Sequence, residues 1–151
     1  MLSVGLLLHR EVDGELEVLL GHMGGPFWAS KEDHAWTIPK GLPEAGETDL
    51  LGVALREFAE EMGLVAPTGE TVDLGACKAA RKTNHVFARR AEFDAESITS
   101  NTFELEWPPR SGRIQSFPEV DRAAWWSMPE ARTKLVKGQL PFLDRLTAAV
   151  R

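Results

Sequence analysis

Three glutamates, Glu57, Glu60 and Glu61, are the residues best suited to chemistry in this sequence. The surrounding residues predict a helix of about three turns, on which the three carboxylates fall within an arc of about 100°. Carboxylates three and four positions apart on a helix repel each other by roughly 0.2–0.5 kcal/mol per pair. With only Arg56 nearby, a bound hard cation such as Mg²⁺, which takes oxygen ligands, would explain this arrangement. The alternative is a solvated acidic face.

The same predicted helix carries an apolar stripe separate from the glutamates. Its members lie at helical spacing and are expected to face the core: Leu51, Leu55, Phe58 and Met62. Gly63 follows directly and is expected to end the helix, as a glycine at this position commonly does. The pattern predicts one face buried against the protein and another face formed by acidic side chains.

The stretch from Gly41 to Leu64 resembles the Nudix box, Gx5Ex7REUxEExGU, in which U is a bulky aliphatic residue. Phe58 stands at the first U, and the other matching positions are Gly41, Glu47, Arg56, Glu57, Glu60, Glu61, Gly63 and Leu64. The sequence departs from the pattern once, because eight residues rather than seven separate Glu47 from Arg56. The extra residue leaves the spacing of the three glutamates unchanged. It bears on the pairing of Glu47 with Arg56, which in this family braces the loop against the helix.

The resemblance implies an α/β fold, the Nudix-type α/β/α sandwich with a mixed β-sheet, formed by residues 1–151 as a single domain. Residues 118–131, PEVDRAAWWSMPEA, also look like the closing portion of Nudix domains. The implied activity is metal-dependent hydrolysis of a pyrophosphate bond in a nucleoside diphosphate-linked substrate, with Mg²⁺ or Mn²⁺ as cofactor. Dinucleoside polyphosphates, nucleoside triphosphates and ADP-ribose-like sugars remain open as substrates. The alternative is a catalytically inactive Nudix-fold module that binds a nucleotide or regulates.

Site roles follow from the resemblance, position by position. Glu60 and Glu61 are the first expected metal ligands, and Glu57 is either a third ligand or the base that takes the proton of the attacking water. Arg56 is expected to orient these carboxylates rather than to contact the substrate. A further carboxylate often enters the site from outside the box. Glu119 is expected in that role, and the alternatives are Glu104 and Glu106.

Substrate contacts are expected at several positions outside the acidic helix. Lys40 and Gly41 lie in TIPKG, which is similar to the PKG of Nudix enzymes that act on dinucleoside polyphosphates or diphosphoinositol phosphates. The candidates for phosphate contact are Arg81, Lys82 and His85, and those for stacking on a base are Phe27, Trp28 and Trp107. The alternative is that the basic residues are cations on the surface and that the aromatic residues belong to the core.

Composition limits the partners. The formal net charge of −6 argues against a nucleic-acid polymer, although a bound divalent cation can still attract a small phosphorylated nucleotide. Cys77 is a single cysteine, so no internal disulfide forms and a reducing, cytoplasmic setting is expected. No apolar run reaches the roughly 18 residues of a membrane span, so no membrane partner is expected. Nudix proteins are often dimers, and a homodimer is consistent with the sequence, although nothing in it identifies an interface.

Hydrophobic patterning predicts a mixed set of elements. Strands are expected at 3–9, 16–20, 36–38, 72–80, 86–93 and 123–126, and residues 103–107 alternate like a further strand. Asp13 and Gly14 mark a hairpin turn, and residues 81–85 are expected to link two strands. Ser127 is the expected N-cap of a helix that runs to about Val136, and a last helix is expected over 141–150.

Overall fold

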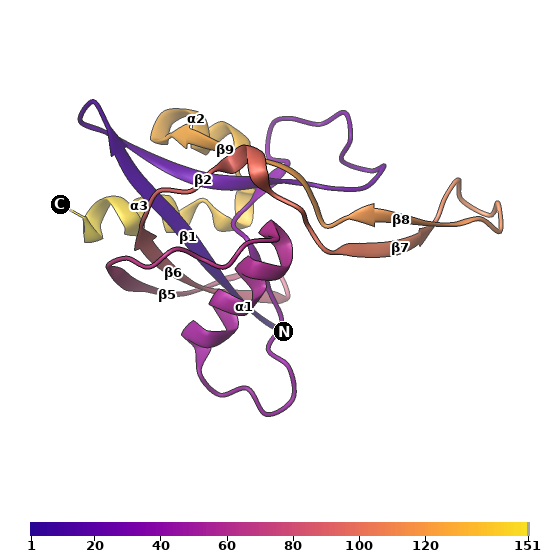
Figure 1. Ribbon diagram of the computed structural model, residues 1–151, viewed down its shortest axis with the longest axis horizontal. Helices are drawn as coiled ribbons and strands as arrows, with labels where there is room; N and C mark the ends of the chain where they lie inside the picture. Colours follow the sequence, from indigo (N-terminus) through magenta and orange to yellow (C-terminus); the bar gives the residue numbers. More distant parts are fainter. Residues whose placement is uncertain (151) are drawn as a thin grey trace.

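A computed structural model describes residues 1–150 of the chain. Within this range the chain folds into three layers (Figure 1). A mixed β-sheet forms the middle layer, with α1 (Leu50–Met62) on one face and α2 (Met128–Lys134) and α3 (Pro141–Ala149) on the other. The expected α/β/α sandwich is therefore confirmed. None of the helices in residues 1–150 has the length and apolar character needed to span a membrane.

Seven strands of residues 1–150 form the main sheet: β1 (Leu2–Val12), β2 (Glu15–Met23), β3 (Trp36–Thr37), β4 (Lys40–Gly41), β5 (Thr71–Ala79), β6 (Lys82–Arg90) and β9 (Val120–Ser127). The order is β3-β2-β1-β6-β5, while β4 pairs with β1 and β9 with β2. β1 and β6 run parallel from the Leu2–Thr83 pair to the His9–Arg90 pair, and the remaining pairings are antiparallel. β1 is therefore the central strand.

The β1–β2 hairpin turns at Asp13 and Gly14, as the sequence predicts. Both residues have positive φ, 52° and 80°, which is the conformation of a tight two-residue hairpin turn. The paired strands extend beyond the predicted ranges, because β2 continues to Met23 through its pairing with β9. Residues 21–23, which follow the predicted strand, are therefore part of the sheet.

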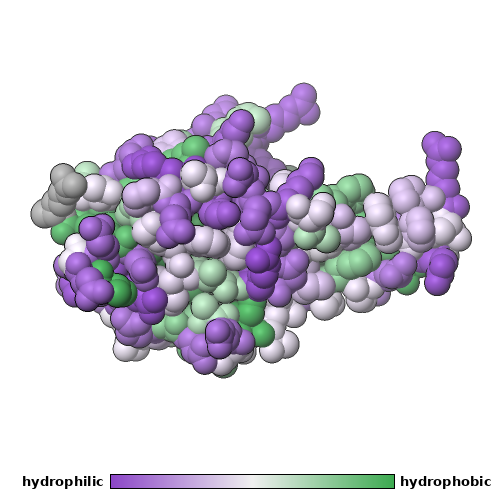
Figure 2. Space-filling model, turned by 90° about the horizontal axis from the view of Figure 1, so that it is seen from above, coloured by the Kyte–Doolittle hydropathy of each residue, from purple (hydrophilic) through white to green (hydrophobic). Residues whose placement is uncertain are grey.

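A second, two-stranded sheet projects from the body as an arm, formed by β7 (Thr102–Glu106) and β8 (Ile114–Pro118). Figures 1 and 2 show this arm standing away from the three layers, with apolar residues along part of it. The alternation of Phe103 and Leu105 predicts β7 correctly. The sequence pattern does not predict β8, because polar and apolar residues do not alternate in IQSFP and the segment ends in proline.

Two helix ends are capped by the residues that the sequence predicts. Gly63 has φ 75° and donates its N–H to the carbonyl of Ala59, so it ends α1 as expected. The Ser127 hydroxyl accepts from the backbone N–H of Glu130, so the predicted N-cap of α2 is confirmed. α2 ends at Lys134, earlier than expected. Two short 3₁₀ turns, η1 (Ala95–Ser97) and η2 (Lys137–Gln139), complete the chain.

The prediction of an apolar stripe separate from the acidic face is wrong in part. Phe58 and Met62 are fully buried, but Leu51 and Leu55 are half-buried. Other residues of α1 take their place against the sheet, namely Val53, Ala54 and Glu57. Glu57 is 9% exposed, so one of the three glutamates lies on the buried face of the helix. Periodicity identifies the faces of a helix, but it does not fix which of them meets the sheet.

The expected link over residues 81–85 is also wrong. β5 and β6 meet in a tight turn at Ala80 and Arg81, and β6 already begins at Lys82. Asn84 pairs with Cys77 on one side and with Ser3 on the other, so its backbone completes the sheet although its side chain is polar. Predicting strands from apolar residues alone misses this polar start of β6.

Replacing Phe58 by Ala is expected to destabilise the protein by about 3–5 kcal/mol, because a fully buried ring between α1 and the sheet is lost. The matched control is Leu51→Ala on the same helix, which is expected to cost less than about 1 kcal/mol because the side chain is half-buried. Urea denaturation followed by circular dichroism measures both. Equal losses would contradict this description of the α1 interface.

Candidate functional site

Arg56 joins α1 to the loop that precedes it. Its Nε donates to Oε2 of Glu47 at 3.0 Å and its Nη2 donates to Oε1 at 2.8 Å, which makes a bidentate pair. Nη2 also donates to the carbonyl of Leu42 at 3.0 Å. These hydrogen bonds hold the pKa of the Glu47 carboxyl below its usual range. The extra residue between Glu47 and Arg56 therefore does not prevent their pairing.

The same guanidinium also reaches the acidic turn. Arg56 Nη1 lies 3.1 Å from Oε1 of Glu60 and 3.4 Å from Oε1 of Glu57. The pKa of Arg56 is raised, first by its hydrogen bonds to Glu47 and then by the hydrogen bond to Glu60 and the charge of Glu57. One guanidinium thus forms ion pairs with several carboxylates, and it holds Glu60 on the side of the helix that faces Arg56.

A cavity of about 300 Å³ lies beside α1, where β4, the start of β1 and the base of the arm come together. The chemically important residues that line it are Lys40, Gly41, Glu57, Glu61, Lys82 and Glu119. The structure thus brings together the end of the acidic helix, the PKG segment and one carboxylate from far along the chain. Glu60 does not line this cavity.

Gly41 allows the backbone of β4 to approach the Glu57 carboxylate. A Cβ at this position would collide with the carboxyl group of Glu57, so a larger residue would force that side chain to move. Oε2 of Glu57 is buried and has no hydrogen-bond partner among the residues that the structure describes. A buried carboxylate oxygen without a partner is costly for the metal-free protein, and it is an acceptor ready for a ligand.

Burial shifts the proton affinities of the cavity residues. It raises the pKa of Glu57 to about 7, with repulsion from Glu60 adding to the effect and Arg56 opposing it. Burial also raises the pKa of Glu61 to about 8, an effect that the positive charge of Lys40 reduces. Burial lowers the pKa of Lys40, although Glu61 counteracts it. The site therefore holds more buried carboxylate than its neighbouring cations neutralise.

These features fit a hard divalent cation. The donors are carboxylate oxygens, one of them unpaired, and their excess negative charge is of the kind that Mg²⁺ or Mn²⁺ neutralises. In the conformation described for residues 1–150, no three acidic, histidine or cysteine side chains are grouped so as to hold an ion. Glu60 instead accepts a hydrogen bond from Nη1 of Arg56 at 3.1 Å.

Glu119 and its two alternatives lie in different places. Glu119 lines the cavity, and its backbone fixes it there by accepting from the N–H of Gly24 at 3.0 Å and donating to Asn101 at 2.9 Å. Glu104 and Glu106 lie on β7 of the arm, are exposed and do not line the cavity. Oε2 of Glu106 instead accepts from the backbone of the arm at Gly112. The geometry therefore favours Glu119.

The basic candidates are also separated. Lys82 lines the cavity, whereas Arg81 is exposed at the β5–β6 turn and does not line it. His85 is hydrogen-bonded to Asp73 at 2.6 Å and stacks on Phe87, so it is engaged within the sheet. β6 begins at Lys82, so the strand positions this side chain, whereas Arg81 belongs to the turn that precedes the strand.

The aromatic candidates do not line the cavity. Phe27 and Trp107 contact each other edge to face, with their ring centres 5.2 Å apart, where the loop after β2 meets the arm. Trp28 packs beside the core on the α3 side of the sheet, with the Lys31 ammonium 5.4 Å from its ring centre. Two polar residues that the sequence did not indicate, Ser3 and Asn101, also line the cavity. No sequence motif singles them out, since the sheet register and the base of the arm bring them there.

Comparison with known proteins identifies the family. The family model of the NUDIX domain matches residues 1–146. The chain therefore belongs to the Nudix family, and the resemblance inferred from the box is confirmed. A search of curated proteins found no match.

Solved structures give the same fold. The NUDIX domain of Shewanella oneidensis NrtR in complex with ADP ribose matches with a TM-score of 0.64 at 19% identity, covering 100% of this chain and 88% of that one. A binary complex of C. elegans Ap4A hydrolase has a TM-score of 0.60 at 20% identity and covers 99% and 96%. The Nudix hydrolase RenU from M. smegmatis has a TM-score of 0.58 at 21% identity and covers 99% and 86%.

The stability of the metal-free protein is expected to fall as the pH rises. The pKa values of Glu57 and Glu61, about 7 and about 8, exceed the ordinary 4.5, so the folded chain binds these protons more tightly than the unfolded chain. The resulting stabilisation is complete below about pH 4.5 and is lost as the pH rises through 7 and 8.

Urea denaturation in EDTA at a series of pH values tests this dependence. The midpoint is expected to decrease across this range, and Glu61→Gln should flatten the curve because one of the two titrating groups is removed. The control Glu96→Gln, on an exposed residue of η1, should keep the slope of the parent protein. A pH-independent midpoint in the parent protein would contradict the buried, unneutralised state of these carboxylates.

Proposed function

We propose that this chain is a Nudix pyrophosphohydrolase, which hydrolyses a pyrophosphate bond in a nucleoside diphosphate-linked substrate with Mg²⁺ or Mn²⁺ as cofactor. The observation that carries the proposal is the shared cavity. Glu57, Glu61 and Glu119 line it together with Lys40 and Lys82, so carboxylates for a cation and ammonium groups for phosphates meet in one place. The cavity is small and is lined by both acidic and basic side chains, which suits a small substrate that carries anionic groups.

The residues that would hold the metal are Glu57, Glu61 and Glu119 from the cavity, with Glu60 beside them on α1. When bound, the divalent cation neutralises the diphosphate and lowers the pKa of the attacking water. Arg56 then acts through its neighbours, because it fixes Glu60 and braces the preceding loop through Glu47. This is a positioning role rather than a contact with the substrate.

The other residues of the cavity attract the phosphates of the substrate or accept a proton. Lys40 and Lys82 offer ammonium groups that attract phosphate oxygens, and Gly41 keeps the backbone close to the acidic helix. Glu57 has a carboxylate oxygen without a hydrogen-bond partner within residues 1–150, so it is placed to accept a proton from a water in the cavity. Arg81, expected at first as a phosphate contact, is left out of the proposed site because it lies outside the cavity.

Three substrate classes are consistent with the proposal: dinucleoside polyphosphates, nucleoside triphosphates and ADP-ribose-like sugars. The PKG segment at Lys40 favours the first class slightly. Two structural neighbours are consistent with this range, since one is an Ap4A hydrolase and another binds ADP ribose. The deciding experiment is a phosphate-release screen of the purified chain over these classes, with Mg²⁺ and Mn²⁺ in parallel.

A second candidate function is nucleotide binding without cleavage. The observation that favours it is the involvement of Glu57 and Glu60 in ion pairs with Arg56, together with the absence of a grouped metal triad in residues 1–150. Isothermal titration with the same substrate panel separates the two functions. Tight binding of a nucleotide without turnover in excess Mg²⁺ would support the binding module and reject the hydrolase.

Replacing Glu61 by Gln is expected to lower kcat/KM by at least about 100-fold, because a half-buried ligand of the metal loses its charge. The circular dichroism spectrum and the stability at neutral pH should be retained, since the side chain keeps its volume. Glu96→Gln, which changes an exposed residue on η1, is the matched control and should stay within about twofold of the parent enzyme. Unchanged turnover in Glu61→Gln would contradict the proposed site.

The role of Glu119 is tested in the same assay against its alternative Glu106. Glu119→Gln is expected to reduce kcat/KM about 10- to 100-fold and to raise the Mg²⁺ concentration needed for half-maximal rate. Glu106→Gln should leave both quantities unchanged, because this carboxylate lies on the arm, outside the cavity. The reverse result would assign the outer carboxylate to the arm.

A further inference from the structure

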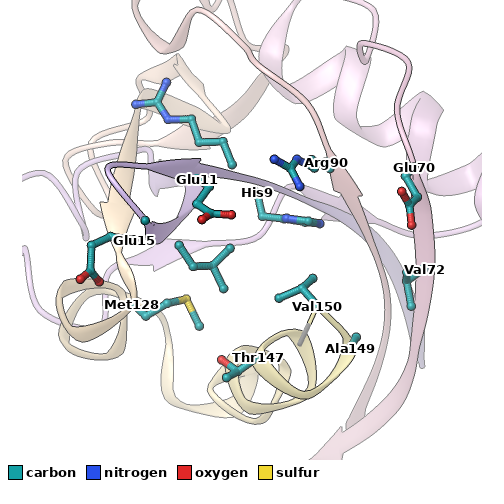
Figure 3. A pocket seen from close by; sticks show the side chains of 13 residues that line it. His9, Glu11, Glu15, Glu70, Val72, Arg90, Met128, Thr147, Ala149 and Val150 are labelled. Atoms are coloured by element: carbon teal, nitrogen blue, oxygen red, sulfur yellow. The ribbon is translucent and has the colours of Figure 1, made fainter.

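A larger cavity, of about 600 Å³, lies at the opposite end of β1 from the carboxylate site. It opens between the β1–β2 hairpin, the end of α3 and the start of α2 (Figure 3). β1 and β2 extend past the core here, and α3 presents only the small side chains of Thr147 and Ala149. The helices therefore leave the sheet uncovered at this end, and space for a small molecule remains.

One side of this cavity is apolar. Leu16 and Val72 contribute from β2 and β5, and Met128 from the first turn of α2. All three are half-buried and pack against the core on the α3 side of the sheet. A ligand with a hydrocarbon or aromatic body would gain free energy by covering this surface.

His9 is the buried polar side chain of the cavity. It is 6% exposed, and its ring nitrogens form no hydrogen bond within residues 1–150. Burial lowers the pKa of His9, and the positive charge of Arg90 lowers it further, although Glu70 opposes both. The neutral imidazole therefore has one nitrogen that can accept a hydrogen bond from a ligand. Figure 3 shows the ring in the space between the strands and α3.

Carboxylates dominate the mouth of the cavity. Glu11, Glu15 and Glu70 line it, and no ion pair within the described chain neutralises them. Figure 3 shows the carboxylate of Glu11 directed into the cavity. The guanidinium of Arg10 is engaged elsewhere, with Glu17 at 2.9 Å and Glu92 at 3.0 Å, which leaves Arg90 as the opposing cation of the described lining. The local charge is therefore negative.

We propose that this cavity is a binding site for a small organic cation, a protonated amine attached to an apolar body. The ammonium group lies among the carboxylates of Glu11 and Glu70 and donates to the imidazole of His9, while the apolar body covers Leu16 and Met128. A free phosphate or nucleotide is disfavoured here by the same carboxylates. The site is separate from the proposed catalytic centre, and its existence does not depend on the proposed activity.

Nuclear magnetic resonance titration of the full chain tests the site, with 2-phenylethylammonium as the probe. Saturable shifts are expected for the backbone amides of Gly14, Thr147 and Ala149, which surround the cavity. The neutral isostere 2-phenylethanol should bind at least about tenfold more weakly, and 3-phenylpropanoate more weakly still, because the carboxylates favour a cation. Equal affinities, shifts confined to other regions or no saturable shift would overturn the proposal.

Two variants separate the charge effect from a general loss of structure. Glu11→Gln/Glu70→Gln is expected to weaken binding of the ammonium probe about tenfold while leaving that of the alcohol unchanged, since both residues are exposed and their removal does not disturb the core. Glu96→Gln, away from the cavity, should bind the probe as the parent does. An unchanged ammonium affinity in the double variant would show that the carboxylates do not recognise the cation.

Discussion

The contact between the Glu57 carboxylate and the backbone of β4 at Gly41 is the constraint on which the site depends. Burial of Phe58 and Met62 holds α1 against the sheet, and this docking places Glu57 on the inner face of the helix. Glycine at position 41 is what makes room for the carboxyl group. The apolar packing of α1 thus opposes the cost of desolvating a charged group, and the stability of the core maintains an acidic site.

Arg56 and Lys40 divide the neutralisation of this acidic cluster between them. Arg56 lies on the outer side of α1, where it connects the loop at Glu47 with Glu60 and touches Glu57. Lys40 lies on the cavity side and reduces the rise in the pKa of Glu61. Because two different cations hold the two sides, a change on one side leaves the charge of the other in place.

Local motifs predicted most of the fold and the acidic helix, since a spacing of three and four residues fixes which carboxylates share a helical face. Two outcomes depended on tertiary structure instead. Leu51 is half-buried while Glu57 is buried, because the sheet contacts a face that the apolar stripe does not mark. Lys82 rather than Arg81 lines the cavity because the turn before β6 is tighter than the polar segment suggested. Sequence spacing alone does not predict either of these outcomes.

The parallel pairing of β1 with β6 has a consequence for the order of assembly. Leu2 pairs with Thr83, so the central strand stays without one neighbour until most of the chain has left the ribosome. The chain between β1 and β6 forms a long loop, and closing this loop costs chain entropy before any contact compensates for the cost. Folding of such topologies is therefore slow. The apolar β1 strand is meanwhile open to incorrect pairing, and its early partner is β2, which the tight turn at Gly14 brings into place.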